Sequence, residues 1–228
     1  MDTQFRFAPL ADRMRPTKME EFIGQTHIVY PKSFLMRAIQ SGSLGSCIFY
    51  GPPGTGKTTI ANLIARARDG EFRKLNAVSS GVADAKEVIK EARVNQTMAG
   101  KKTFLVLDEC HRWNKAQSDC VLEAIEDGSI IFIGTTTENP YINMTRAIVS
   151  RCKVFEFRPL TTADVKKALL RGIEDKDRGY GNYPLDILLN QYTNPKTYIT
   201  METGMSLPTT ISPWIDDILY LKKLQKTD

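Results

Sequence analysis

Short apolar runs alternate along this chain with longer stretches in which apolar residues recur at helical spacing. A run such as Ile130–Gly134, bounded by turn residues, is typical of a strand that is buried on both faces of a parallel sheet. The same reasoning applies to four other segments. The five predicted strands are Cys47–Tyr50, Arg73–Val78, Phe104–Leu107, Ile130–Gly134 and Lys153–Phe157.

Amphipathic stretches lie between these runs and predict helices that cover the sheet. The predicted helices of this part of the chain are Ser33–Gln40, Thr59–Ala67, Ala83–Asn95, Lys115–Asp127 and Ile142–Ser150. Strands that alternate with helices at this spacing indicate a three-layer α/β fold, in which helices lie on both faces of a parallel sheet.

The pattern changes after Leu160. Thr161–Asp164 opens one more helix, but the regular alternation is lost beyond Asn182. We therefore expect a core over residues 1–160, an incomplete helical region over 161–183 and an atypical tail over 184–228. Within the tail, Ser212 and Pro213 are good helix-start residues and predict a short helix over 213–225.

Composition adds limits rather than a function. The 228 residues are 42% hydrophobic and 25% charged, as in ordinary soluble globular proteins. No apolar run is long enough for a transmembrane helix, and the first residues lack the pattern of a secretory signal. The cysteines form no C-x-x-C pair, so we expect reduced thiols and a cytoplasmic location. A net charge of +5 is compatible with a polyanionic partner but does not establish one.

The segment Gly51–Thr58 fits the phosphate-loop pattern G-x-x-x-x-G-K-[ST] at every fixed position, between a predicted strand and a predicted helix. Glycines let backbone N–H groups approach phosphate oxygens, Lys57 suits the β- and γ-phosphates, and the Thr58 hydroxyl suits Mg²⁺. This context disfavours a glycine-rich turn that binds nothing. The residues predicted to bind a nucleoside triphosphate here are Gly51, Pro52, Pro53, Gly54, Thr55, Gly56, Lys57, Thr58 and Thr59.

Two adjacent carboxylates, Asp108 and Glu109, follow the third predicted strand. Since side chains alternate along a strand, the two should point to opposite sides. We expect Asp108 to hold Mg²⁺ and Glu109 to orient or activate the hydrolytic water. An acidic pair at about fifty residues from Lys57 strengthens the interpretation of both motifs.

The run Asp108-Glu109-Cys110-His111 also has the form of a DExH-box helicase motif. A helicase of that class needs a second motor domain with its own arginine motif, which is far more chain than remains here. We therefore disfavour this alternative and interpret His111 as a structural residue that follows the strand.

Several motifs carry a resemblance to a known family. They are Pro9–Pro16, Ile23–Gln25, Gly51–Thr58, Asp108–Gln117, Gly134–Pro140 and Ser150–Cys152. On these motifs, residues from about 8 to 183 resemble the AAA+ ATPases of the replication-associated recombination protein A (RarA) family, which includes the Werner-helicase-interacting ATPases and is similar to clamp loaders and RuvB. The run Asp108–Gln117 resembles the family's D-E-I-H-R-F-N-K-A-Q, with Cys110 and Trp113 as departures.

The resemblance implies roles for further residues. The segment around Pro16 would contact the adenine of ATP through Arg13, Ile23 and Gly24. Thr136, Thr137 and Asn139 would form sensor 1, which holds the water and detects the γ-phosphate. Arg151 would be an arginine finger that completes a neighbouring subunit's site, so hydrolysis should depend on a homo-oligomer. The catalytic residues implied in this way are Lys57, Glu109, Asn139 and Arg151.

The resemblance also implies partners and shows a departure. Family members form oligomers and act on stalled or gapped replication forks, often beside single-strand-binding protein. The candidates for DNA phosphate contacts are Lys101, Lys102, Lys166, Lys167 and Arg171. The family's Gly-Asp-x-Arg lid motif does not occur downstream, and the tail looks like foreign sequence on a truncated core. We therefore expect ATP binding, and hold open a nucleotide-binding fragment with little hydrolysis that acts as an interaction module.

Overall fold

The computed structural model describes residues 8–67 and 70–182. The chain divides into two compact units. One is the segment Pro16–Leu160, and the described part of the other comprises residues 8–15 and 161–182. The predicted tail over 184–228 and its helix over 213–225 lie outside the described residues.

A five-stranded parallel sheet forms the centre of the larger unit, in the order β2-β3-β4-β1-β5. Its register places Tyr50 beside Thr136 and Asn76 beside Asp108, so the carboxyl ends of these parallel strands lie at one edge of the sheet. The strands are β1 (Cys47–Tyr50), β2 (Glu71–Asn76), β3 (Thr103–Asp108), β4 (Ile130–Thr136) and β5 (Lys153–Glu156).

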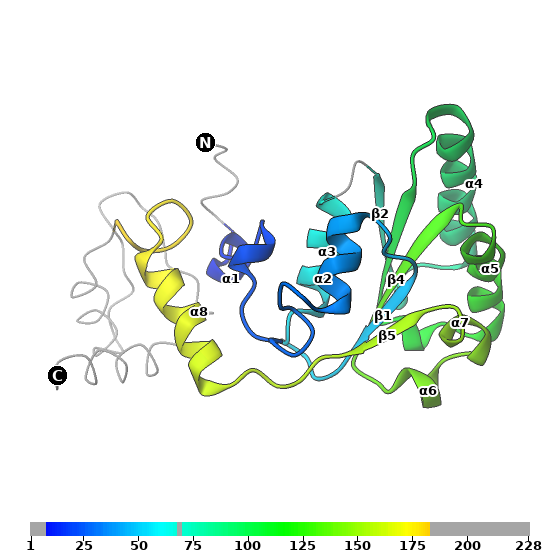
Figure 1. Ribbon diagram of the computed structural model, residues 1–228. Coiled ribbons are helices and arrows are strands. Elements are labelled where there is room, and N and C mark those ends of the chain that lie inside the picture. The colour runs from blue at the N-terminus through cyan, green and yellow to red at the C-terminus, as the bar shows by residue number, and fades with distance from the viewer. Residues whose placement is uncertain (1–7, 68–69, 183–228) are drawn as a thin grey trace, which may run out of the picture. The chain divides into compact units, whose positions relative to one another are not determined.

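Helices cover both faces of this sheet (Figure 1), which confirms the predicted three-layer α/β fold. On one face, α2 (Phe34–Ser41) and α3 (Lys57–Arg66) pack against Phe49 and the other strand side chains that point to the same face of the sheet. On the opposite face, α4 (Val82–Ala99) and α5 (Lys115–Glu126) pack against Ile48 and the other strand side chains that point to that face. The alternation of strand side chains therefore divides the apolar residues into two cores.

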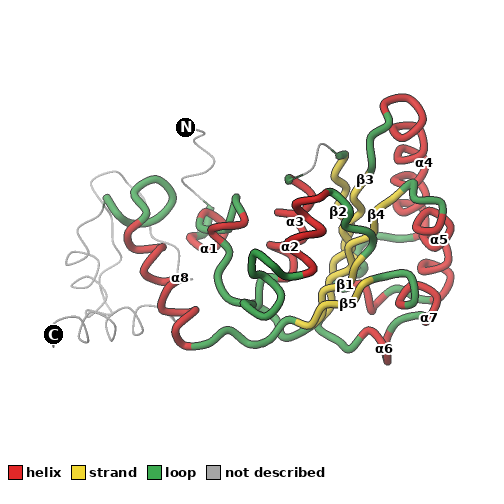
Figure 2. Tube along the Cα trace, in the orientation of Figure 1, coloured by secondary structure: helices red, strands yellow, loops and turns green. Residues whose placement is uncertain are grey.

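Some element boundaries differ from those predicted. Strand β2 starts two residues earlier than expected and stops at Asn76, and α4 continues to Ala99, where Gly100 takes a left-handed conformation with φ 62°. The predicted helix over Ile142–Ser150 is instead two short helices, α6 (Pro140–Asn143) and α7 (Arg146–Val149), as Figure 2 shows. Extended backbone at Met144 interrupts the helix between them.

Shorter elements complete the description. The larger unit includes two 3-10 turns, η2 (Met19–Glu21) and η3 (Cys110–Arg112). The smaller unit contains α1 (Leu10–Arg13) and α8 (Thr162–Glu174), and a capping box between Thr161 and Asp164 starts α8. No helix in residues 8–67 or 70–182 has the length and apolar character that a membrane crossing requires.

Candidate nucleotide-binding site

The phosphate loop joins β1 to α3 and requires glycine where it approaches other parts of the unit. At Gly51 the backbone has φ 142°, and a Cβ atom would lie 2.1 Å from the carbonyl oxygen of Phe157. At Gly56 φ is 96°, and a Cβ atom would lie 2.8 Å from the ring of Phe22. Only glycine fits both positions, because other residues rarely adopt these φ angles and no space is left for a Cβ atom.

Lys57, the first residue of α3, is folded back over this loop. Its Nζ donates hydrogen bonds to the carbonyl oxygens of Gly51 and Pro52, each at 2.7 Å. Burial lowers the pKa of Lys57, while the nearby carboxylates of Glu109 and Asp108 act in the opposite direction. A buried ammonium group thus lies at the helix start, where a phosphate would also meet the free N–H groups of α3.

Asp108, the last residue of β3, contacts the phosphate-loop helix and the neighbouring strand. Its Oδ1 lies 3.4 Å from the Thr58 hydroxyl and accepts a hydrogen bond from Thr135 of β4. Its Oδ2 lies 3.9 Å from Nζ of Lys74. The structure therefore brings together Thr58 and Asp108, the two predicted Mg²⁺ ligands. A hydroxyl and a carboxylate oxygen are hard donors of the kind Mg²⁺ prefers, so this pair fits the ion.

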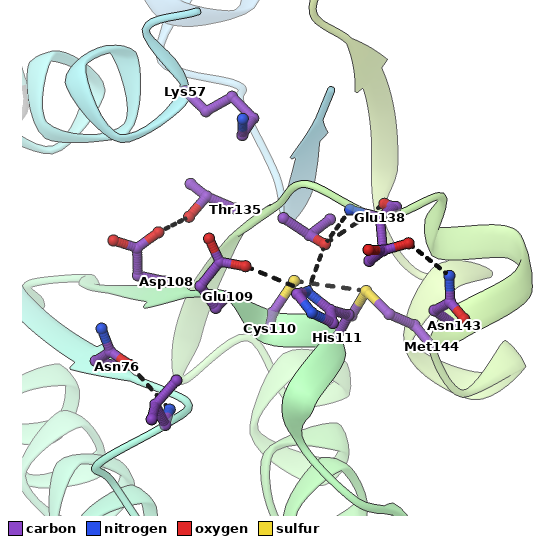
Figure 3. Close-up of polar contacts among 12 residues, drawn as sticks. Lys57, Asn76, Asp108, Glu109, Cys110, His111, Thr135, Glu138, Asn143 and Met144 are labelled. Atoms are coloured by element: carbon purple, nitrogen blue, oxygen red, sulfur yellow. Dashed lines mark hydrogen bonds and ion pairs between the residues drawn. The ribbon is translucent and has the colours of Figure 1, made fainter. Parts of the chain in front are cut away.

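Glu109 does not continue the strand, which corrects the predicted alternation. Strand β3 ends at Asp108, and Glu109 has the left-handed angles φ 54° and ψ 42°. The turn, rather than the pleat of the strand, therefore sets the direction of its carboxylate. Figure 3 shows Glu109 and His111 facing each other, with Oε2 of Glu109 3.4 Å from Nδ1 of His111.

The end of β4 supplies further hydroxyl groups to the site. Thr135 and Thr136 are buried, whereas Thr137 is exposed. The Thr136 hydroxyl lies 2.8 Å from Nδ1 of His111. Asn139 lies beyond the strand, where its side chain accepts a hydrogen bond from the N–H of Tyr141 at 3.0 Å and caps α6. Thr136 thus belongs to the polar network of the site, and Asn139 shapes the loop beside it.

The segment that follows Pro16 lies against the phosphate loop. Gln25 exchanges two hydrogen bonds with the backbone of Arg158, at 2.7 and 2.9 Å, and its amide lies 3.4 Å from the carbonyl oxygen of Thr55. This buried glutamine fixes Ile23 and Gly24 in the same unit as the loop. Arg13 belongs to the smaller unit, where its guanidinium lies 5.5 Å from the ring centre of Tyr180. Its adenine contact stays a prediction.

Arg151 follows α7 and is about two-fifths exposed, at 39%. Its guanidinium donates to the carbonyl oxygen of Ala147 at 2.9 Å and forms an ion pair with Glu126 at the end of α5. These contacts hold the side chain at the surface of the larger unit.

Sequence reasoning missed two residues of the site and undervalued a third. Thr135 is not among the predicted site residues, although the pairing of Leu107 with Gly134 places it next to Asp108. The role of Gln25 in fixing the loop has no signal in one sequence, since both of its partners are backbone groups. The sequence favours a structural role for His111, and the structure places its Nδ1 in contact with Glu109 and Thr136.

Comparison with known proteins gives this arrangement its family. The fold resembles the solved structure of the Thermotoga maritima RuvB Holliday junction branch migration motor, with TM-score 0.58 and 27% identity over 71% of this chain and 54% of that one. Residues 14–150 match the model of the Holliday junction DNA helicase RuvB P-loop domain. This chain belongs to the RuvB-type P-loop ATPase family. Its membership decides for the AAA+ interpretation and against the DExH alternative at Asp108–His111.

The relatives of this chain among the AAA+ ATPases include RarA proteins, as its motifs predict. The chain is 42% identical over 201 residues to replication-associated recombination protein A of Haemophilus influenzae, covering 88% of this chain and 45% of the relative. It is 47% identical over 187 residues to the Escherichia coli protein of that name, covering 82% and 41%. ATPase WRNIP1 of Dictyostelium discoideum is 48% identical over 168 residues, which cover 74% and 19%. The chain thus spans less than half the length of these relatives.

Proposed function

We propose that this chain binds ATP with Mg²⁺ and hydrolyses it, with residues 1–160 as the AAA+ core. The observation that supports this most is the 3.4 Å approach of the Thr58 hydroxyl to Asp108. It joins the phosphate loop to the acidic end of a separate strand, as the two motifs of a P-loop ATPase must be joined.

Each residue of the loop and of the strand end would have a distinct task. Lys57 would leave the carbonyl oxygens that it now contacts and bind the β- and γ-phosphates. Thr58 and Asp108 would hold Mg²⁺, which neutralises phosphate charge when bound. Glu109 would orient or activate the attacking water.

The remaining predicted residues would complete the site around the nucleotide. Thr136, Thr137 and Asn139 lie at or beyond the end of β4, beside the phosphate-loop strand in the sheet. Ile23 and Gly24, held against the loop by Gln25, would contact the adenine together with Arg13. Arg151 would act on the ATP of a neighbouring subunit, since it lies at the surface.

We further propose that the domain acts on DNA in replication-fork maintenance and recombination, in the cytoplasm, as a homo-oligomer that meets single-strand-binding protein. The names of the relatives support the proposed action on DNA, since they include replication-associated recombination proteins and a Holliday junction motor. The candidate phosphate contacts lie in two places, Lys101 and Lys102 before β3, and Lys166, Lys167 and Arg171 on α8.

The test is steady-state ATP hydrolysis by the full chain with and without forked or gapped DNA, beside a Lys57→Ala variant. We expect Mg²⁺-dependent hydrolysis that DNA stimulates and that Lys57→Ala reduces by about 10²-fold or more, since it loses its phosphate contact. ATP binding with hydrolysis no higher than that of Lys57→Ala would contradict the proposal. That outcome would favour the alternative, a nucleotide-binding interaction module.

A further inference from the structure

His111 contacts two groups that have different roles in the proposed reaction, the Glu109 carboxylate and the Thr136 hydroxyl. Its Nδ1 is 3.4 Å from Oε2 of Glu109 and 2.8 Å from the hydroxyl of Thr136. The histidine side chain is only 14% exposed, and that of Glu109 is 33% exposed. One ring nitrogen of a largely buried side chain therefore connects the end of β3 to the end of β4 (Figure 3).

The backbone around His111 is fixed by the residues on either side. His111 belongs to η3, and its neighbour Cys110 is buried in the core beneath α4 and α5. Trp113, just after the turn, is buried in the same core, and the thiol of Cys110 also contacts the sulfur of Met144 at 3.5 Å. With both flanks packed in this way, the ring has little freedom to leave the two groups it contacts.

The neighbouring atoms favour one tautomer of the ring. A bare Nδ1 would place a lone pair beside the Glu109 carboxylate, whereas an Nδ1–H is attracted to it. The Thr136 hydroxyl then accepts from Nδ1–H, and its own proton points to the carbonyl oxygen of Glu138 at 3.4 Å. The Nδ1–H form is therefore the one in which Glu109 and Thr136 both act as acceptors.

We infer that His111 is a positioning residue that holds the Glu109 carboxylate at a fixed position relative to the Thr136 hydroxyl. The inference rests on the proposed function, because it assumes that Glu109 orients the hydrolytic water and that Thr136 detects the γ-phosphate. When the bound nucleotide changes, a movement at the end of β4 would be passed to Glu109 through the His111 ring. Since His111 touches neither water nor phosphate in this scheme, its effect is on the rate and not on ATP affinity.

Hydrolysis and binding by variants of the full chain test the inference. We expect His111→Ala to lower kcat by about 10- to 100-fold, since a misplaced group costs rates of that order, with the ATP dissociation constant within about twofold. His111→Asn should recover most of the rate, because its amide places a polar atom where Nδ1 stands. The matched control is His27→Ala, which removes the chain's other histidine, whose Nε2 contacts the backbone of Glu156 at 2.9 Å, and leaves kcat unchanged.

A double-mutant cycle separates positioning from a general loss of stability. If His111 acts through Glu109, adding His111→Ala to Glu109→Gln lowers the rate no further. Equal extra losses in both backgrounds would overturn the inference, as would a wild-type kcat for His111→Ala. A Glu109→Gln variant as fast as wild type would instead contradict the proposed role of Glu109, so the two failures are distinguishable.

A spectroscopic measurement decides the case without any hydrolysis. Long-range ¹H–¹⁵N correlation spectra report both ring nitrogens of the two histidines. We expect Glu109→Gln and Thr136→Val each to shift the Nδ1 resonance of His111 and to leave the resonances of His27 in place. An unchanged His111 resonance in both variants would overturn the inference.

Discussion

Several residues of the phosphate loop are constrained by backbone groups. Lys57 donates to two carbonyl oxygens of its own loop, and Thr55 donates to the carbonyl oxygen of Pro52 at 2.8 Å. Gly51 is constrained more tightly, because its φ of 142° and the nearby Phe157 carbonyl leave no place for a Cβ atom. The shape of the loop therefore depends on that position before any ligand binds.

Gly51→Ala should destabilise the protein by about 2 kcal/mol or more, because the new Cβ meets a backbone oxygen and the φ angle is strained. Gly45→Ala is the matched control, since no heavy atom lies within 4 Å of a Cβ built there and its φ is unexceptional. Urea unfolding of both variants measures the difference. A Gly51→Ala variant as stable as Gly45→Ala would show that the loop adapts.

Several helices of this fold, α2, α5, α6 and α8, begin with side-chain caps. Helix α5 starts with a capping box, in which Asn114 accepts from the N–H of Gln117 at 3.0 Å and Gln117 accepts from that of Asn114 at 2.9 Å. The helix carries Val121 and Ala124 into the core against β4. It also ends at Glu126, the partner of Arg151.

Asn114→Ala should lower the free energy of unfolding by about 1 kcal/mol, the usual cost of losing such a cap. The control is Asn95→Ala inside α4, where alanine is the better helix former and stability should be unchanged or slightly higher. Thermal and urea unfolding of the two variants test this. Equal stability of both would mean that packing alone fixes the start of α5.

At the scale of the whole molecule, parallel strands bring distant motifs to one edge of the sheet. The loop after β1, the acids at the end of β3 and the threonines of β4 all meet there. Arg151 forms an ion pair with Glu126, and Lys57 contacts the carbonyl oxygens of its own loop. The proposed role of Arg151 would add the arginine of a second molecule to this site.

Mixing two inactive variants should restore hydrolysis. Arg151→Ala retains its own phosphate loop, and Lys57→Ala retains its arginine, so a mixed oligomer contains some sites with both groups. An equal, random mixture should reach about a quarter of the wild-type rate, because half the loops are intact and half of their neighbours supply the arginine. Each variant alone is the control. A mixture no faster than its components would argue that Arg151 does not act on a neighbour.

The sequence by itself determined the fold class, the order of the strands along the chain and the two nucleotide motifs. These features have local causes. Apolar runs such as Ile130–Gly134 predict buried strands, and the fixed positions of Gly51–Thr58 predict a phosphate loop. The boundaries were less predictable, because α4 continues past Asn95 to a glycine in a left-handed conformation and Met144 divides one predicted helix into two.

Only the tertiary structure decided how the site is connected. The left-handed turn at Glu109 overrides the alternation of the strand and turns its carboxylate to His111. The contacts of Thr135 with Asp108 and of Gln25 with Arg158 join residues from different elements, 27 and 133 positions apart. A single sequence records which residues are present, whereas such contacts depend on the strand register and on the way the elements pack.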